Sequence, residues 1–409
     1  MWLYNLGISL YAGGIRLAAL WHGKARLWSE GRRNIFERME AAVRPSDRIV
    51  WVHAASLGEF EQARPIIERL RAEHPEYKIL LTFFSPSGYE IRKNYEGADY
   101  VFYLPADPPS NARRFLDIVH PEIAIFIKYE FWINLLSELR RRKVRSYIVS
   151  AIFRRNSVFF RPYGAMWRQA LETFDTLFVQ NVESKRLLSE IGFDNVVVAG
   201  DTRFDRVAQI AAAAQRVETI ERFRGGGRLF VAGSTWGPDE EILLPLVNAN
   251  PDVKFVIAPH EMDEGRIAHL MRNAKGGAVR YTQCDAATRF DDVQVLVLDT
   301  MGMLSSVYGS ATWAYVGGGF GVGIHNTLEA ATFGLPIAFG PNYGKFKEAR
   351  DMVSLGCAVS VRTAGELAAW FAPLCDDEET LRRASRTAKD YTARNQGATG
   401  IILRSIFNS

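Results

Sequence analysis

Short apolar runs alternate with amphipathic stretches along most of the chain, from about residue 48 onward. The runs are four to six residues long and largely apolar at every position, which is typical of strands buried on both faces of a parallel sheet. Helical patterns such as 60–73 and 134–142 separate them. The first predicted strands are 49–54, 78–83, 100–104, 123–127, 146–149 and 176–179. Strand, helix, strand at this spacing predicts a parallel, doubly wound α/β sheet.

A second set of runs follows the consecutive glycines at 225–227. It comprises predicted strands at 229–232, 255–258, 293–298, 311–316 and 336–339, with helices that include 240–247 and 262–273. A chain of 409 residues is too long for one ordinary core. We therefore expect two Rossmann-like domains facing each other across a cleft, with ligands at the carboxyl ends of the strands. The expected division is 1–33 for an N-terminal segment, 34–205 and 206–385 for the two domains, and 386–409 for a helical tail.

The N-terminal segment differs from the rest of the chain. Residues 1–15 carry no charge, Arg16 interrupts the apolar stretch, and a basic cluster follows at Lys24, Arg26, Arg32 and Arg33. A secretory signal places its charges before the apolar core, so we expect no cleavage. A membrane span needs about 20 apolar residues, which makes a span marginal here. We favour a membrane anchor or interfacial helix with the basic flank at the cytoplasmic face, and the alternative is an amphipathic helix packed on the protein itself.

Composition and charge exclude several classes of function. Charged residues make up 23% of the chain and the net charge is only +4, so no nucleic-acid partner is implied. The three cysteines, Cys284, Cys357 and Cys375, are scattered, which fits core packing in a reducing compartment. The seven histidines do not cluster and no Asp-x-Asp element follows a strand. Neither a metal site nor another cofactor is predicted.

A glycine-rich segment near the end of the second domain carries the most specific signal. The apolar run 311–316 leads into five glycines within 317–323 and then into a helical pattern at 327–333. Backbone amides at a positive helix end bind phosphate, so we expect a phosphate site here. Glu329 shares a helical face with Asn326 and is placed to accept hydrogen bonds from a sugar hydroxyl. The segment therefore suggests a nucleotide or a sugar-nucleotide.

Common nucleotide motifs do not match. A P-loop needs four residues between its first glycine and Gly-Lys, whereas Gly340 and the pair Gly344-Lys345 are separated by three. The glycines at 317–323 also miss the third glycine of the G-x-G-x-x-G dinucleotide motif. These mismatches argue against ATP and NAD as ligands.

Two carboxylates stand just past the ends of buried strands in the first domain. Glu59 follows Ser56 and Gly58 at the first strand–helix turn, and Glu130 follows the strand 123–127. A carboxylate at this edge can act as a general base on an acceptor hydroxyl. The alternative for Glu59 is charge complementarity with a helix N-terminus, and the alternative for Glu130 is a paired structural charge. Position alone leaves these alternatives open.

Further candidates come from the second domain and its junction. His325 either caps the glycine segment or touches phosphate. Arg203 and Lys345 are able to neutralise a leaving phosphate, although basic residues are common and each is a weak signal. The candidates that follow predicted strands are Pro259, His260, Met301, Gly302 and Met303.

Taken together, these residues resemble the motif series of the 3-deoxy-D-manno-octulosonic acid (Kdo) transferases. The order, the spacing, the apolar N-terminus and the overall length agree, so the resemblance covers nearly the whole chain. The segments that carry it are Ala55-Ser56-Leu57-Gly58-Glu59-Phe60, Glu130-Phe131-Trp132, Met301-Gly302 and His325-Asn326-Thr327-Leu328-Glu329.

The resemblance implies a GT-B fold and a glycosyltransferase at the inner membrane of a Gram-negative bacterium. The donor would be CMP-Kdo, bound by the second domain. The acceptor would be the phosphorylated glucosamine disaccharide precursor of lipid A, bound by the first domain, with inversion at the anomeric carbon and without a metal. The family's general base falls on Glu59, and Glu130 is the second catalytic candidate. Ser56, Gly58 and Arg203 are weaker candidates for phosphate or acceptor contact.

The donor contacts that the resemblance implies lie in the second domain. They fall on the Pro259-His260 turn, on Met301-Gly302-Met303, and on Asn326, Thr327, Leu328 and Glu329, with Gly323 and His325 expected in the same site. Three positions depart from the family pattern. Many members carry Pro-Arg-His where this chain has Pro259-His260-Glu261, Met-Gly-Glu where Met303 stands, and Asn-Ala-Arg where Ser150-Ala151-Ile152 stands. A positive charge expected near CMP is therefore missing or is supplied elsewhere.

Two other classes of function stay open on sequence grounds. One is another two-domain sugar-nucleotide enzyme, such as a UDP-sugar epimerase or an N-acetylglucosaminyl transferase, which would not need the apolar N-terminus. The other is a membrane-tethered protein that binds a nucleotide without turnover. Glu59 and Glu130 at strand ends argue against the second class.

Overall fold

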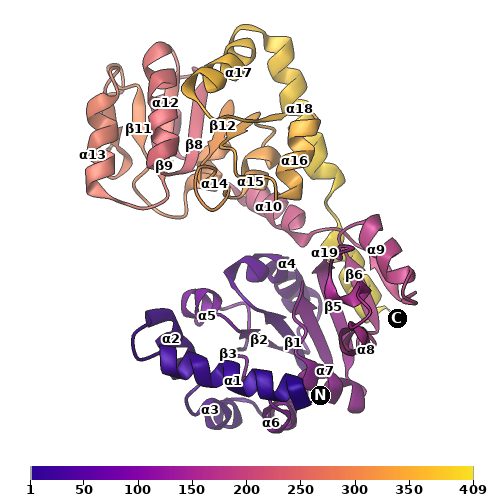
Figure 1. Cartoon of the computed structure of the whole chain (residues 1–409). Coiled ribbons are helices and arrows are strands. Elements are labelled where there is room, and N and C mark those ends of the chain that lie inside the picture. Colours follow the sequence, from indigo (N-terminus) through magenta and orange to yellow (C-terminus); the bar gives the residue numbers. More distant parts are fainter. Residues whose placement is uncertain (1, 409) are drawn as a thin grey trace. The chain divides into compact units, whose positions relative to one another are not determined.

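The computed structural model describes residues 2–408 and divides the chain into two compact units (Figure 1). The first unit contains the chain up to Arg206 and again from Gln396, and the second runs from Val207 to Asn395. Each unit is built on a seven-stranded sheet whose neighbouring strands are parallel. The predicted fold class of two doubly wound α/β domains is confirmed.

In the first unit the strands lie in the order β3-β2-β1-β4-β5-β6-β7. They are β1 Ile49–Ala54, β2 Lys78–Phe83, β3 Tyr100–Tyr103, β4 Ile123–Ile127, β5 Arg145–Ala151, β6 Thr176–Val179 and β7 Val196–Val198. The helices are α1 Trp2–Ala18, α2 Gly23–Gly31, α3 Ile35–Ala42, α4 Leu57–Glu73, α5 Pro86–Arg92, α6 Pro109–Val119, α7 Ile133–Arg141, α8 Ala165–Leu171, α9 Val182–Ser189 and α19 Ala398–Phe407, and a 3₁₀ turn covers Val158–Phe160. Helix α10, Thr202–Ala213, contains the boundary between the units.

In the second unit the order is β10-β11-β9-β8-β12-β13-β14. The strands are β8 Leu229–Thr235, β9 Lys254–Pro259, β10 Ala278–Arg280, β11 Val295–Val297, β12 Trp313–Val316, β13 Ile337–Phe339 and β14 Ala358–Ser360. The helices are α11 Glu218–Arg224, α12 Gly237–Ala249, α13 Glu264–Asn273, α14 Leu304–Tyr308, α15 Thr327–Thr332, α16 Lys347–Ser354, α17 Ala364–Asp376 and α18 Glu378–Arg394, with a 3₁₀ turn at Tyr281–Gln283.

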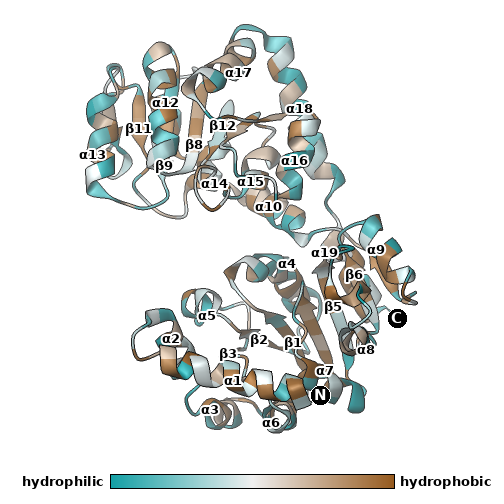
Figure 2. Ribbon diagram, viewed as in Figure 1, coloured by the Kyte–Doolittle hydropathy of each residue, from teal (hydrophilic) through white to brown (hydrophobic). Residues whose placement is uncertain are grey.

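The strands are apolar because helices cover both faces of each sheet. In β1, Trp51 belongs to one core cluster while its neighbours Val50 and Val52 belong to the cluster on the other face. The strands of both units are correspondingly hydrophobic in Figure 2. Each large apolar side chain buried in this way contributes about 1.5–3 kcal/mol. Two-sided burial therefore fixes the sheets and brings their strand ends to one edge.

Three strands escaped prediction from the sequence, namely β7, β10 and β14. Each is only three residues long and lies at the edge of its sheet. An edge strand is covered less completely, so it does not need the long apolar run by which the central strands were recognised.

The winding of each sheet reverses at one point. In the first sheet this point lies between β1 and β4, and in the second it lies between β8 and β12. Loops that follow the two strands at such a point diverge to opposite faces and leave a crevice for a ligand. Glu59 follows β1 and Glu130 follows β4, whereas the glycine segment follows β12.

Helix α1 covers most of the N-terminal segment but has no buried residue. Apolar and polar residues alternate along it in Figure 2. Across residues 2–408, no helix has both the length and the apolar character that crossing a membrane requires. The exposed large side chains of α1 are Trp2, Leu3, Leu6, Leu10, Tyr11 and Leu17.

The C-terminal residues do not form one separate tail. Helix α18 belongs to the second unit, and α19 returns to the first. The carboxylate of Asp205 anchors this return, because it accepts hydrogen bonds from the Gly397 amide at 2.5 Å and the Thr399 amide at 2.7 Å. Ile402, Leu403 and Ile406 then enter the core cluster that covers one face of the first sheet.

Candidate active site

Glu59 lies in the first turn of α4, directly after β1. Ser56 is the N-cap residue of this helix, and its hydroxyl donates a hydrogen bond to the Glu59 carboxylate. The carboxylate is thus held at the carboxyl edge of the central strand, where sequence reasoning placed it. A methyl group at Gly58 would meet only the Ser56 hydroxyl oxygen, at 3.8 Å, so the turn itself does not require glycine there.

Glu130 is the centre of a small polar network at the neighbouring strand end. Its Oε2 lies 3.2 Å from Nε2 of His53 and accepts a hydrogen bond of 2.9 Å from the indole Nε1 of Trp132. His53 is fully buried on β1, and its Nδ1 lies 2.8 Å from Oγ1 of Thr82 on β2. The Glu130 side chain is 17% exposed. The carboxylate can therefore reach a ligand. His53 and Trp132 hold its orientation, and Thr82 in turn holds His53.

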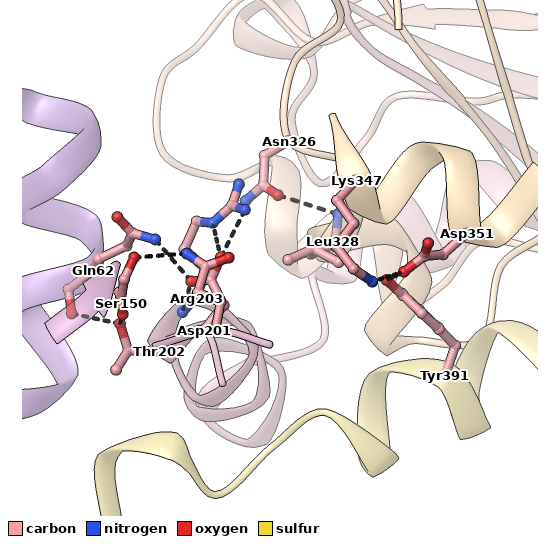
Figure 3. Close-up of polar contacts among 11 residues, drawn as sticks. Gln62, Ser150, Asp201, Thr202, Arg203, Asn326, Leu328, Lys347, Asp351 and Tyr391 are labelled. Atoms are coloured by element: carbon pink, nitrogen blue, oxygen red, sulfur yellow. Dashed lines mark hydrogen bonds and ion pairs between the residues drawn. The ribbon is translucent and has the colours of Figure 1, made fainter. Parts of the chain in front are cut away.

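Arg203 has a carboxylate partner within its own unit (Figure 3). Its Nη2 donates to Oδ2 of the buried Asp201 at 2.8 Å, and Gln62 on α4 donates to the other oxygen of Asp201 at 2.9 Å. Burial by itself would raise the pKa of Asp201, but the charge and hydrogen bonds of Arg203 keep that pKa below its usual value. This ion pair partly neutralises Arg203, the residue predicted to bind phosphate.

The second unit holds a pocket of about 450 Å³ at the carboxyl ends of β8, β9 and β12, within the usual range for ligand sites. Three rings stand in a row along it. Trp236 and His260 lie 4.8 Å apart between ring centroids, and His260 and His325 lie 4.3 Å apart. The pocket is lined by Trp236, Pro238, Asp239, His260, Gly318, Phe320, Gly321, Val322, Gly323 and His325.

The indole Nε1 of Trp236 donates to Nε2 of His325 at 3.2 Å. This nitrogen must carry a lone pair to accept, so the hydrogen bond favours a neutral imidazole. Burial, followed by the nearby His260, lowers the pKa of His325 below its ordinary value. The aromatic row therefore offers flat surfaces for stacking and a neutral imidazole whose protonated form a bound anion would stabilise.

Asp239 on α12 holds parts of the pocket wall together through hydrogen bonds. Its carboxylate accepts from the Trp236 amide at 2.9 Å, the Gly318 amide at 3.0 Å and the Tyr315 hydroxyl at 2.8 Å. Burial raises the pKa of Asp239. The buried Asp239 thus links Trp236, just after β8, to Gly318 of the glycine segment. These hydrogen bonds hold the backbone of Trp236, whose ring belongs to the aromatic row.

Three amides of the glycine segment, where a phosphate site is expected, already have partners within the fold. The Gly317 amide donates to the Gly233 carbonyl, the Gly318 amide to Asp239, and the Gly321 amide to the Gly318 carbonyl. Those three amides are therefore committed to the fold. A methyl group at Gly319 would come within 2.5 Å of the Gly340 Cα, so the glycines here serve close packing of two backbones.

The remaining donor candidates form a second cluster beside the start of α15. Asn326 is the N-cap residue, and its Oδ1 accepts from the Leu328 amide at 3.1 Å. Glu329 accepts from Nδ2 of Asn326 and from the Ser305 hydroxyl, both at 3.0 Å. Thr327 is buried, and its hydroxyl has no hydrogen-bond partner. Met301 is exposed and Gly302 adopts φ +84° in the loop that leads to α14.

The structure brings some sequence candidates together and leaves others apart. His260, Gly323 and His325 share the pocket lining, and Pro259 is the last residue of β9 beside it. Residues 301–303 are not among its lining residues. Among the described residues, no group of three or more His, Cys, Asp and Glu side chains is arranged to hold a metal ion.

Sequence reasoning missed His53, Trp236 and Asp239. His53 is the one polar residue in an otherwise apolar strand, and this interruption could have marked it as a candidate site residue. Trp236 and Asp239 start a helix directly after β8, which is the same position in the second sheet that Glu59 occupies in the first. A comparison of equivalent strand ends would have found them.

Comparison with solved structures identifies the fold. The fold resembles the UDP-GlcNAc 2-epimerase of Neisseria meningitidis with a TM-score of 0.61 at 15% identity, covering 88% of this chain and 100% of that one. It resembles MurG of Acinetobacter baumannii with a TM-score of 0.55 at 12% identity, covering 89% of this chain and 100% of that one. The protein has the GT-B fold that glycosyltransferases and epimerases share.

Sequence comparison then identifies the family. The family profile described as 3-deoxy-D-manno-octulosonic-acid transferase (kdotransferase) matches residues 32–206. The chain is 28% identical to the Kdo transferase of Bordetella pertussis over 87% of its own length and 86% of that protein. It is 25% identical to the enzyme of Haemophilus influenzae, over 88% and 86% of the two chains. These matches support a Kdo transferase, and the protein is a glycosyltransferase.

Proposed function

We propose that this protein transfers Kdo from CMP-Kdo to the phosphorylated glucosamine disaccharide precursor of lipid A, with inversion and without a metal. The observation that carries the proposal is the position of the motif residues within each unit. Glu59 and Glu130 flank the reversal point of the first sheet, and His260 and His325 line the pocket beside the reversal point of the second. These are the positions at which α/β sheets bind their ligands.

In this proposal Glu59 is the general base. Its carboxylate takes the proton of the acceptor hydroxyl as that oxygen forms a bond to the anomeric carbon of Kdo. The bond from this carbon to the phosphate oxygen breaks, and CMP leaves with the bonding electrons. The hydrogen bond from Ser56 holds the carboxylate in one orientation before the acceptor binds.

Glu130 has a different role in this proposal, because its Oε2 is held by both the Trp132 indole and the His53 ring. We assign it to contact with the acceptor sugar through its exposed edge. The buried His53 and Thr82 behind it restrict its rotation. Such restriction matters because a positioned group contributes to the rate only while it stays in place.

The donor nucleotide belongs, in this proposal, to the pocket of the second unit. The cytosine stacks against the row formed by Trp236, His260 and His325, and the phosphate approaches an imidazole of the same row. One basic residue next to the row is Arg266, whose guanidinium lies 5.8 Å from the Trp236 ring centroid. Arg266 pairs with Glu240 at 2.7 Å. It is our candidate for the positive charge that the Pro259-His260-Glu261 turn lacks.

We also propose that α1 lies on the cytoplasmic surface of the inner membrane. The support is its row of exposed apolar side chains, among which Trp2, Leu10 and Leu17 are 70%, 67% and 60% exposed. Basic residues follow it at Lys24 and Arg26. An interfacial helix combines these two features.

The test is Glu59→Gln, with Glu73→Gln on the same helix as the matched control. The first change should lower turnover by about two to four orders of magnitude, because the proton loses its acceptor. The thermal shift produced by CMP should be unchanged in both variants. Undiminished turnover in Glu59→Gln would remove the base assignment. A thermal shift with UDP and none with CMP would point to another sugar-nucleotide enzyme.

A further inference from the structure

The start of α7 is held by residues that are remote in sequence. The first amides of a helix have no partner within it, and here Tyr4 of α1 and Asp107 supply the acceptors. The Ile133 amide donates to the Tyr4 hydroxyl at 3.2 Å, and the Asn134 and Leu135 amides donate to Asp107 at 3.0 and 2.9 Å. The Tyr4 hydroxyl in turn donates to Asp107 at 2.7 Å.

Trp132 immediately precedes these three amides. It is the N-cap residue of α7, and its side chain makes no capping hydrogen bond. Its indole is instead directed to Glu130, to which it donates at 2.9 Å. The position of this indole depends on the backbone at the start of α7. Tyr4 bonds to that backbone, so it also affects where the indole lies.

A second set of contacts runs from α1 to the same indole through aromatic rings. Tyr11 stacks on Phe84, with centroids 6.3 Å apart and an angle of 20° between the rings, and Phe84 lies 4.4 Å from Trp132. Phe84 is itself fixed, because Arg32 donates to its carbonyl oxygen at 2.8 Å. Polar and aromatic contacts from α1 thus converge on one side chain.

The inner side of α1 is otherwise sparsely attached. Residues 4, 5, 8, 12, 15 and 18 are half-buried and recur at helical spacing, but none of them is fully buried. Besides Tyr4, Asn5 accepts from Asn134 Nδ2 at 2.8 Å. The contacts that hold the helix therefore include the ones that reach α7 and Trp132.

We infer that Tyr4 and Tyr11 are positioning residues for Glu130, so that α1 organises the active site in addition to contacting the membrane. The inference rests on the proposed role of Glu130 in acceptor binding. Tyr4 acts through the start of α7, and Tyr11 acts through Phe84. Both place the Trp132 indole that orients the Glu130 carboxylate.

The direct test observes the Trp132 indole in protein labelled with ¹⁵N at its nine tryptophans, with Trp132→Phe to assign the resonance. Tyr4→Phe keeps the ring and removes only the hydroxyl, so the fold is preserved. Ser9→Ala is the matched control, because the Ser9 hydroxyl, within residues 2–408, bonds only to the Asn5 carbonyl of its own helix. Tyr4→Phe and Tyr11→Leu should shift or broaden the Trp132 indole signal, and Ser9→Ala should not. An unchanged signal in both tyrosine variants would overturn the inference.

The kinetic test separates positioning from a loss of donor binding. In detergent micelles, Tyr4→Phe and Tyr11→Leu should lower kcat by about ten- to a hundredfold, since small displacements of reacting groups are costly. The KM for CMP-Kdo should stay unchanged, because the donor pocket lies in the other unit. An unchanged kcat would overturn the inference even if the indole signal moved. Absence of transfer by the unmodified protein would refute the proposed function instead, and the indole test would still decide the inference.

Discussion

Individual buried acids position the rings and loops of this protein. Asp239 accepts three hydrogen bonds at the pocket of the second unit, and Asp107 accepts three at the start of α7. A buried carboxylate is tolerated only when such donors satisfy it. Both residues therefore support the site without being proposed to touch substrate. Asp239 holds Trp236, and Asp107 holds the start of α7.

His325 provides a pH-dependent prediction at this scale. Its pKa in the folded protein lies below the ordinary value of 6.5, because of burial and then His260. Below pH 6.5 the unfolded chain therefore binds a proton that the folded chain does not, so folded stability falls as the pH decreases. His325→Gln should reduce this loss between about pH 6.5 and pH 5.

Thermal unfolding of the two proteins at several pH values measures this difference. Parallel curves for His325→Gln and the unmodified protein would contradict the assignment. Bound CMP should also raise the pKa of His325, since a phosphate favours the protonated ring. An NMR titration with and without CMP checks the direction.

At the scale of single elements, α1 has an outer side that remains exposed and an inner side that reaches α7. We expect the protein to bind vesicles that contain anionic lipid more strongly than neutral ones, because exposed apolar residues and a basic flank act together. Replacing Leu10 and Leu17 by serine should weaken binding by about tenfold or more. Co-sedimentation with vesicles measures it, with Ser9→Ala as control. Equal binding before and after the leucine changes would exclude α1 as the contact.

The sequence predicted elements better than it predicted contacts. Central strands such as β1 and β4 were found at their observed limits, because burial on both faces demands an unbroken apolar run. The positions of Glu59 and Glu130 just past strand ends were predicted correctly, because the limits of β1 and β4 could be read from the sequence. The contact between Tyr4 and Asp107 could not be found, because 103 residues separate the two side chains. The hydrogen bonds of the Gly317, Gly318 and Gly321 amides could not be predicted either, because the sequence does not show whether an amide has a partner within the fold.

At the scale of the whole molecule, the chain leaves the first unit in α10 and returns to it after α18. Helix α19 buries Ile402, Leu403 and Ile406 in the first unit. Each such side chain contributes about 1.5–3 kcal/mol, and a domain has only about 5–15 kcal/mol in total. The C-terminal helix is therefore a structural part of the first unit.

A chain that ends at Asn395 should lose the cooperative unfolding of the first unit while CMP still stabilises the second. A chain that ends at Phe407 keeps α19 and serves as the control. Calorimetry with and without CMP distinguishes the two transitions. Full retention of both transitions in the shorter chain would contradict this account of α19.

Mass spectrometry of the acceptor tests the central claim most directly. The protein is incubated with CMP-Kdo and the phosphorylated glucosamine disaccharide precursor of lipid A in detergent micelles. Our account predicts a product that is heavier by whole Kdo residues, together with an equivalent release of CMP. A folded protein that binds CMP yet leaves the acceptor mass unchanged, or that modifies it only with a UDP-sugar, would contradict the account.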